Sequence, residues 1–186
     1  VVHVVECNEP QCVDHAREIE SRWQVNARPW CLVRKGQPPA GPIVTTYFHH
    51  NEIRQRWPDR LREIRFAAIH LDPQLPARVE RHRLRGRRTT LTLCEFEESM
   101  AQAIASDLAM LFPPERYHIR LRVVDQASEV LQPSRSRTIT LFSPRAWGAL
   151  TPEERDDPRA IKARYMFPDE ELHAMGKQFG WRPHRQ

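Results

Sequence analysis

One group of residues in this sequence has the types and spacing of a metal site. Cys7, Cys12 and His15 lie within nine residues, at the end of an expected strand, and Cys31 follows later in the chain. Thiolate sulfur and imidazole nitrogen are ligands of structural Zn²⁺, which is almost always tetrahedral. These four residues could therefore close a zinc site. The spacing matches no common zinc motif, however, so buried free thiols are the alternative interpretation.

The same segment resembles the start of thioredoxin-like [2Fe–2S] ferredoxins, in which a strand, a Cys-x4-Cys pair and a helix follow one another. The resemblance covers residues 1–25 and implies a thioredoxin-like N-terminal lobe. That family uses a second cysteine pair in a later loop, and this sequence has none there. Since four thiolates hold such a cluster, we expect the lobe without the cluster. Cys7 and Cys12 are not a Cys-x-x-Cys pair, so we expect no dithiol redox activity.

A second group is a run of arginines in residues 79–96, which read VERHRLRGRRTTLTLCEF. The arginines before Gly86 alternate with other residues, and alternate residues of a strand share one face. Gly86 allows the positive φ of a tight turn, so the stretch predicts a β-hairpin with an arginine-covered face. Residues 117–125 also alternate and predict a strand with further arginines. The arginines expected to form one surface are Arg81, Arg83, Arg85, Arg87, Arg88, Arg120 and Arg122.

An arginine-covered sheet face is suited to a negatively charged partner. The planar guanidinium group matches phosphate and carboxylate, and binding to RNA phosphates releases counterions. Nearby His82, Tyr117 and His118 could stack on bases, although no RNP-type aromatic motif is present. Two alternatives stay open. The partner could be an acidic protein, or the face could be solvated, with its arginines paired to carboxylates of the same chain such as Glu80 and Glu95.

No signature of an enzyme stands out. His49, His50 and Glu52 follow an expected strand and could provide ligands or a general base, but a solvated loop explains them as well. His70 and Asp72 end another strand, where a turn-forming aspartate before a proline is an equal explanation. The sequence has no GxGxxG, Walker, GxSxG or HExxH motif. We therefore expect a protein that binds rather than catalyses, without a cofactor unless zinc is bound.

The composition indicates a polar, basic chain with enough apolar residues for a core. Of its 186 residues 40% are hydrophobic and 28% charged, and the formal net charge is +5. Arginine outnumbers lysine by 26 to 3, which either a GC-rich genome or selection for contacts explains. Four scattered cysteines indicate a reducing compartment. No apolar run approaches the roughly 20 residues of a membrane span, and the start at Val1 suggests a processed or excised chain.

The order of expected elements predicts an α+β fold. Strands and helices alternate through residues 1–75, a hairpin, a helix and two strands follow in 76–142, and helices with loops fill 143–186. We expect two layers, a mixed sheet with packed helices, in which 143–186 is a docked tail. The three parts could also form one continuous domain. No internal repeat at a fixed period is visible.

These observations lead to three functional hypotheses. The first is a non-catalytic structural or accessory subunit of a large assembly, which contacts RNA or neighbouring subunits through the arginine face. A mitochondrial ribosome or the matrix side of a respiratory complex would suit an arginine-rich, reduced chain that does not act as an isolated monomer. The second is a free-standing nucleic-acid-binding protein. The third is a zinc-binding protein that uses Cys7, Cys12, His15 and Cys31.

Overall fold

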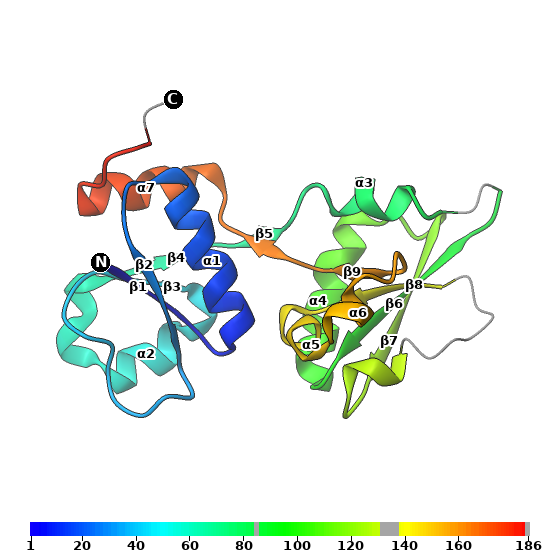
Figure 1. Ribbon diagram of the computed structural model, residues 1–186, viewed down its shortest axis with the longest axis horizontal. Helices are drawn as coiled ribbons and strands as arrows, with labels where there is room; N and C mark the ends of the chain where they lie inside the picture. Colours follow the sequence, from blue (N-terminus) through cyan, green and yellow to red (C-terminus); the bar gives the residue numbers. More distant parts are fainter. Residues whose placement is uncertain (84–85, 131–137, 185–186) are drawn as a thin grey trace. The chain divides into compact units, whose positions relative to one another are not determined.

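The chain forms two compact units, which a computed structural model describes over residues 1–83, 86–130 and 138–184 (Figure 1). Unit 1 comprises Val1–His70 and Met166–Gln186, and unit 2 comprises Leu71–Tyr165. The chain therefore passes from one unit to the other twice. The two passages contain the short strands β5 (His70–Leu71) and β10 (Tyr165–Met166), which pair with each other.

Unit 1 is built on a sheet of four parallel strands in the order β2-β1-β3-β4. The central strands β1 and β3 are buried along their whole length, and all of their residues except His3 and Glu6 are apolar or β-branched. Burial on both faces is typical of parallel sheets, which helices cover on either side. The strands are β1 (Val2–Glu6), β2 (Ala27–Cys31), β3 (Ile43–Thr46) and β4 (Ile64–Ala67).

Helices cover both faces of this sheet. On one face, Ile19 of α1 and Met175 of α7 pack with Val4 and Val44 of the sheet. On the other face, Ile53 of α2 packs with further strand residues. Unit 1 thus has three layers, rather than the two that were predicted. Its helices are α1 (Glu9–Arg22), η1 (Tyr47–His49), α2 (His50–Arg56), η2 (Pro58–Glu63) and α7 (Asp169–Phe179).

Unit 2 contains a second sheet of four parallel strands, in the order β7-β6-β8-β9. The strands are β6 (Thr89–Glu95), β7 (Tyr117–Val123), β8 (Ile139–Phe142) and β9 (Ala160–Lys162). Its helices are α3 (Leu75–Glu80), α4 (Glu98–Leu111), η3 (Ala127–Val130), α5 (Pro144–Ala149) and α6 (Pro152–Arg155). Helix α4 lies against β6 and β7, and α5 packs on Cys94 and Phe142.

The two units repeat one topology. In each, the first strand lies between the second and the third, and the fourth follows the third at an edge. In each, the first strand ends in a buried glutamate, Glu6 or Glu95, and a helix of 14 residues begins three residues later. The chain therefore contains an internal repeat of topology. The repeat is not visible as a period in the sequence, because few residues are identical at equivalent positions of the two units.

The β-hairpin predicted for residues 79–96 is wrong. Val79 and Glu80 end helix α3, and β6 begins at Thr89 with only parallel neighbours. Leu75 and Val79 lie one helical turn apart and are both fully buried, so apolar burial favours the helix over the strand suggested by alternating arginines. Gly86 has a positive φ of 75°, as expected for a turn, but it belongs to the loop before β6.

Other expectations are confirmed or corrected by the same topology. The chain has the mixed α and β content that was predicted, but both four-stranded sheets are parallel and not mixed. Unit 1 begins with the expected strand and helix, β1 and α1. The rest of its four-stranded sheet consists of parallel strands only. The region 143–186 is no separate tail, because its first part completes unit 2 and its last part supplies α7 to unit 1. None of the helices in the described ranges is long and apolar enough to cross a membrane.

Candidate functional site

The carboxyl ends of β1 and β3 form the point of unit 1 where ligands are expected. The helices that follow these neighbouring strands, α1 and α2, lie on opposite faces of the sheet. In open α/β sheets, binding sites occur at such a topological switch point. Glu6 and Cys7 come from the end of β1, and His49 comes from the turn after β3. We call these three residues the switch-point cluster.

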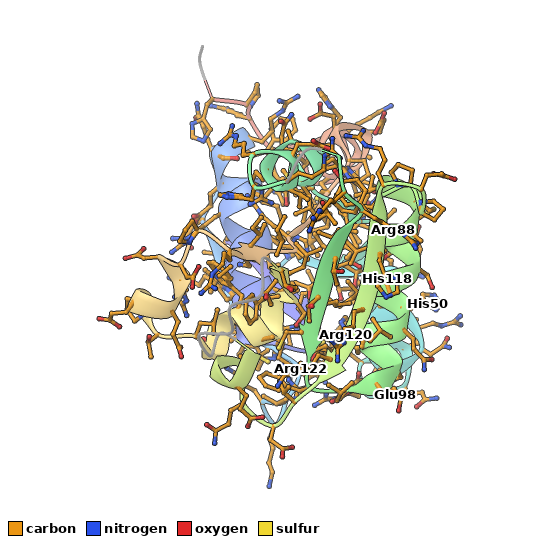
Figure 2. The ribbon with its side chains drawn as sticks, turned by 90° about the vertical axis from the view of Figure 1, so that its right-hand side faces the viewer. His50, Arg88, Glu98, His118, Arg120 and Arg122 are labelled. Carbon is orange, nitrogen blue, oxygen red and sulfur yellow. The ribbon has the colours of Figure 1, made fainter. Side chains whose placement is uncertain are left out.

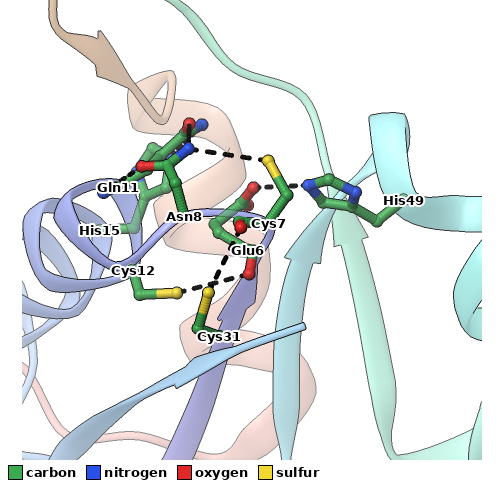
Figure 3. A network of polar contacts seen from close by, with 8 residues as sticks. All are labelled: Glu6, Cys7, Asn8, Gln11, Cys12, His15, Cys31 and His49. Atoms are coloured by element: carbon green, nitrogen blue, oxygen red, sulfur yellow. Dashed lines mark hydrogen bonds and ion pairs between the residues drawn. The ribbon is translucent and has the colours of Figure 1, made fainter. Parts of the chain in front are cut away.

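A buried ion pair holds this cluster together. His49 Nε2 lies 2.9 Å from Glu6 Oε2, and the two side chains are 12% and 1% exposed. Burial alone would lower the pKa of His49, but hydrogen bonds with Cys7 and Glu6, together with the charge of Glu6, raise it to about 10. His49 is therefore an imidazolium at neutral pH, held by a carboxylate that water does not reach (Figure 3).

An exposed thiol lies beside this imidazolium. Cys7 is the exposed one of the chain's four free cysteines, and the Asn8 side-chain amide donates a 3.6 Å hydrogen bond to its sulfur. The Asn8 side-chain oxygen also accepts from the Gln11 backbone amide, so Asn8 caps helix α1. This cap fixes the backbone around Cys7, which places an accessible nucleophile against a fixed positive charge.

The proposed zinc ligands do not come together. The thiols of Cys12 and Cys31 are buried and donate to the backbone carbonyl oxygens of Glu6 and Cys7, at 3.7 and 3.3 Å. Burial, before any other cause, raises the pKa of the Cys12 thiol far above its ordinary value, which opposes the thiolate form that zinc needs. Within the described ranges, no group of three or more His, Cys, Asp or Glu side chains could hold a metal ion.

His15, the fourth proposed ligand, has a structural role. Its ring is fully buried, 3.4 Å from both Gln11 and Glu18, and it stacks on Phe167 at a centroid distance of 4.4 Å. Glu18 in turn accepts from the Phe167 amide at 2.9 Å. His15 therefore ties α1 to the segment before α7 and is directed away from the thiols.

Sequence reasoning missed the partnership within the switch-point cluster. The sequence pattern indicates His49 as a possible general base, but it does not indicate that Glu6 lies beside it. The two residues are 43 positions apart and meet only because β1 pairs with β3. One signal could have found Glu6: a carboxylate that ends a β-branched strand and leads directly into a helix cap.

The proposed arginine surface divides into several environments. Arg81 follows α3 as its C-terminal cap, and Arg83 forms a 3.0 Å ion pair with Glu80. Arg85 lies outside the described residues. Arg87 and Arg88 are exposed in the loop before β6, and Arg120 and Arg122 are exposed on β7. A single arginine-covered hairpin is therefore not formed, but four of the seven arginines are still on or beside one strand.

Glu80 accounts for the part of the arginine group that pairs within the chain. Arg83, Arg116 and the Tyr117 hydroxyl all contact its carboxylate, with Arg116 at 2.7 Å. The hydrogen bond from Tyr117 holds the pKa of Glu80 below its usual range. Burial, together with the charge of Glu80, raises the pKa of Tyr117 to about 12. The alternative of internal ion pairing is therefore confirmed for Arg83.

Strand β7 presents the remaining cations along one line. His118, Arg120 and Arg122 are alternate, exposed residues of this edge strand, and Figure 2 shows them following one another along it with Arg88 near its start. Arg88 is fixed there by a 3.2 Å hydrogen bond from its Nε to the Tyr117 carbonyl. We name this surface the β7 basic edge; it consists of Arg87, Arg88, His118, Arg120 and Arg122.

Two features distinguish the β7 basic edge from the other charged surfaces. No ion pair among the described residues involves any of its four arginines, whereas five of the eight other described arginines of unit 2 have a carboxylate partner. Its strand also has no neighbour on its outer side within the described ranges.

Comparison of the chain with models of protein families, with curated proteins and with solved structures gives no match.

Proposed function

We propose that the protein is a non-catalytic accessory module that binds RNA through the β7 basic edge as part of a larger assembly. The observation that carries this proposal is the line of exposed arginines, unpaired within the described part of the chain, on one edge strand. The alternate residues of a strand lie roughly 6.6 Å apart, so Arg120 and Arg122 can contact neighbouring phosphates of an extended strand. A basic track of this kind follows a nucleic-acid backbone without reading its sequence.

The composition of the edge favours phosphate over bulk solvent. Guanidinium groups form bidentate hydrogen bonds with phosphate, and His118 adds a ring that can stack on a base. The arginine of the loop, Arg88, is already fixed by its bond to the backbone, which lowers the conformational entropy that binding must remove. The setting in a ribosome or a respiratory complex rests on composition alone.

A neighbouring protein subunit is the second candidate, because the same strand has a free backbone edge. Leu121 and Val123, on the opposite face from the arginines, are 37% and 45% exposed. A strand added by a partner would satisfy the outer backbone groups of β7 and cover these two side chains. An acidic partner would also neutralise the arginines.

Salt-dependent binding tests the first candidate. The affinity of a labelled single-stranded RNA of about ten nucleotides is measured by fluorescence anisotropy at several salt concentrations. We expect the double variant R120A/R122A to bind more weakly, and the slope of log K against log salt to fall by about 1.4, since each phosphate contact contributes about 0.7.

The matched control is R54A/R62A, which removes two exposed arginines from unit 1 and changes the net charge equally. This control should keep nearly all of the slope. RNA binding that is absent, or that falls equally in both double variants, would overturn the RNA proposal. Absent RNA binding combined with capture of an acidic partner that R120A/R122A abolishes would favour the protein partner instead.

A further inference from the structure

Unit 2 contains a pocket that lies away from the β7 basic edge. Its volume is about 210 Å³, and three groups of residues line it. The first comes from α3 and the turn after it, the second from β9 and Pro158 just before it, and the third is Trp147 of α5. In the sheet order β9 is the edge strand opposite β7, so the pocket uses none of the residues assigned to RNA. We call it the β9 pocket.

The chain places three basic side chains on one face of α3 and its extension. Arg78, Arg81 and His82 are at positions i, i+3 and i+4, which share a helix face. Arg81 keeps helical backbone angles, and the His82 amide still donates to the Val79 carbonyl at 3.0 Å, so the helical direction continues through this turn. Buried Leu75 and Val79, on the adjoining face of the helix, fix it to the core.

Arg78 is the most firmly held of these cations. Its Nη2 donates to Asp72 Oδ2 at 3.0 Å and to the Lys162 carbonyl of β9 at 3.3 Å. Its Nε is buried and has no hydrogen-bond partner among the described residues. This N–H is closed off from solvent, so a ligand in the pocket would meet the rest of the Arg78 side chain, which is 36% exposed.

The remaining lining supplies a fourth basic group and an apolar wall. Lys162 brings its ammonium group from the end of β9, and no carboxylate is among the lining residues. Trp147 and Ile161 form the apolar side, where an aromatic or aliphatic body can pack. A lining that combines several basic residues with an aromatic ring therefore favours a small molecule with a multiply charged end and an apolar body.

We infer that the β9 pocket binds a small phosphate monoester that has an aromatic or apolar body. A phosphate monoester is close to a dianion at neutral pH and offers three oxygens, which suits two arginines with a lysine or histidine. A phosphodiester of RNA has a single charge and no free end, so it matches the open β7 basic edge and not this pocket. The inference is independent of the proposed RNA function.

Calorimetric titration with simple probes tests the pocket. Phenyl phosphate should bind, inorganic phosphate should bind more weakly because it lacks the apolar body, and phenol should not bind at a comparable concentration. The variant R81A should weaken phenyl phosphate at least tenfold, because it removes one charge-assisted contact. R81K, which keeps the charge but loses the planar fork, should be intermediate.

The arginine variants of the two surfaces serve as controls for each other. R120A/R122A should leave the affinity for phenyl phosphate unchanged, and R81A should leave the affinity for RNA nearly unchanged. Arg81 is exposed, so R81A should keep the circular dichroism spectrum and unfolding midpoint of the parent chain. Phenyl phosphate that fails to bind, or that binds R81A as tightly as the parent chain, would overturn the inference. Displacement of phenyl phosphate by single-stranded RNA would overturn the separation of the two sites.

Discussion

The two units stabilise a buried glutamate in different ways. Both end their first strand in a buried glutamate, Glu6 in unit 1 and Glu95 in unit 2. Glu6 is neutralised by the imidazolium of His49, whereas Glu95 accepts the amide of the next residue, Phe96, at 2.6 Å. A buried carboxylate needs a compensating charge or several donors. At the end of the first strand, the same topology therefore accommodates a titratable ion pair in unit 1 and a hydrogen bond to the backbone in unit 2.

Strand register identifies the residue that makes the difference. Val5 pairs with Thr45 in unit 1, and the equivalent Cys94 pairs with Phe142 in unit 2. Counting four residues onward from each partner gives His49 in one unit and Ala146 in the other. Unit 2 therefore has no imidazole at this position, and Phe96 occupies the place of Cys7. The switch-point cluster belongs to unit 1 alone, and the β7 basic edge and β9 pocket belong to unit 2.

The largest effect is expected from breaking the buried pair. H49A leaves the Glu6 carboxylate buried without its countercharge, so the free energy of unfolding should fall by about 3–5 kcal/mol. E95Q in unit 2 keeps an acceptor for the Phe96 amide and should cost less than about 1.5 kcal/mol. Urea unfolding followed by tryptophan fluorescence measures both. The double variant E6Q/H49Q should recover part of the loss, because neither charge remains buried; equal losses in H49A and E95Q would contradict the contrast between the units.

The same pair predicts how stability depends on pH. The pKa of His49 is raised in the folded chain from 6.5 to about 10, so the folded state binds the proton more tightly. This stabilisation is complete below about pH 6.5 and is lost as the pH rises through about 10. Unfolding measured across this range should show a larger loss for the parent chain than for H49Q. Parallel curves for the two chains would show that His49 does not carry the proton.

Thiol reactivity separates Cys7 from the other cysteines. In the folded chain only Cys7 is exposed, whereas Cys12, Cys31 and Cys94 are buried. Burial, helped by the neighbouring Glu95, raises the pKa of the Cys94 thiol to about 12, which opposes its reaction further. Labelling with iodoacetamide followed by mass spectrometry should therefore modify Cys7 first and the others only in denaturant. Modification of Cys94 as early as Cys7 would show that the core of unit 2 unfolds locally and exposes this thiol to the reagent.

The smallest effect concerns the starts of the matching helices α1 and α4. Asn8 caps α1 by accepting from the Gln11 amide at 3.0 Å, whereas Glu97 at the same position of α4 makes no capping bond. N8A should destabilise the chain by about 1 kcal/mol, and E97N should stabilise it by up to about 1 kcal/mol. Thermal or urea unfolding checks both signs. A loss on E97N would show that the 2.6 Å contact of Glu97 with Arg145 matters more than the cap.

Local signals in the sequence were reliable where the structure depends on neighbouring residues. The Asn8 cap, the capping box of Thr151 and Glu154, and the end of the last helix at Gly180 all use residue types that are typical of those positions. Gly180 has a φ of 65°, which a glycine adopts without steric cost. In each case the groups that satisfy the backbone lie within four residues of it, so the pattern needs no knowledge of the fold.

The alternating arginines led to a wrong prediction of a strand, because polar residues at every second position also occur outside strands. Arg81 and Arg83 alternate as in a strand, but they follow a helix whose buried face is set by Leu75 and Val79. Polar residues at the end of a helix face solvent and do not constrain the fold. Leu75 and Val79, one helical turn apart, are the residues that indicate a helix here. Their importance became clear only from their burial in the structure.

Sequence alone determined the mixed α and β content, the helix caps and the basic character of the chain, because propensity, capping and charge act within a few residues. Tertiary structure decided that both sheets are parallel, that the fold is repeated, and that Glu6 meets His49 across 43 positions. It also placed Arg78, Arg81 and Lys162 around one pocket while Arg120 and Arg122 remained on the opposite edge of the sheet. These outcomes depend on which distant strands exchange hydrogen bonds, and no short pattern of residues specifies that choice.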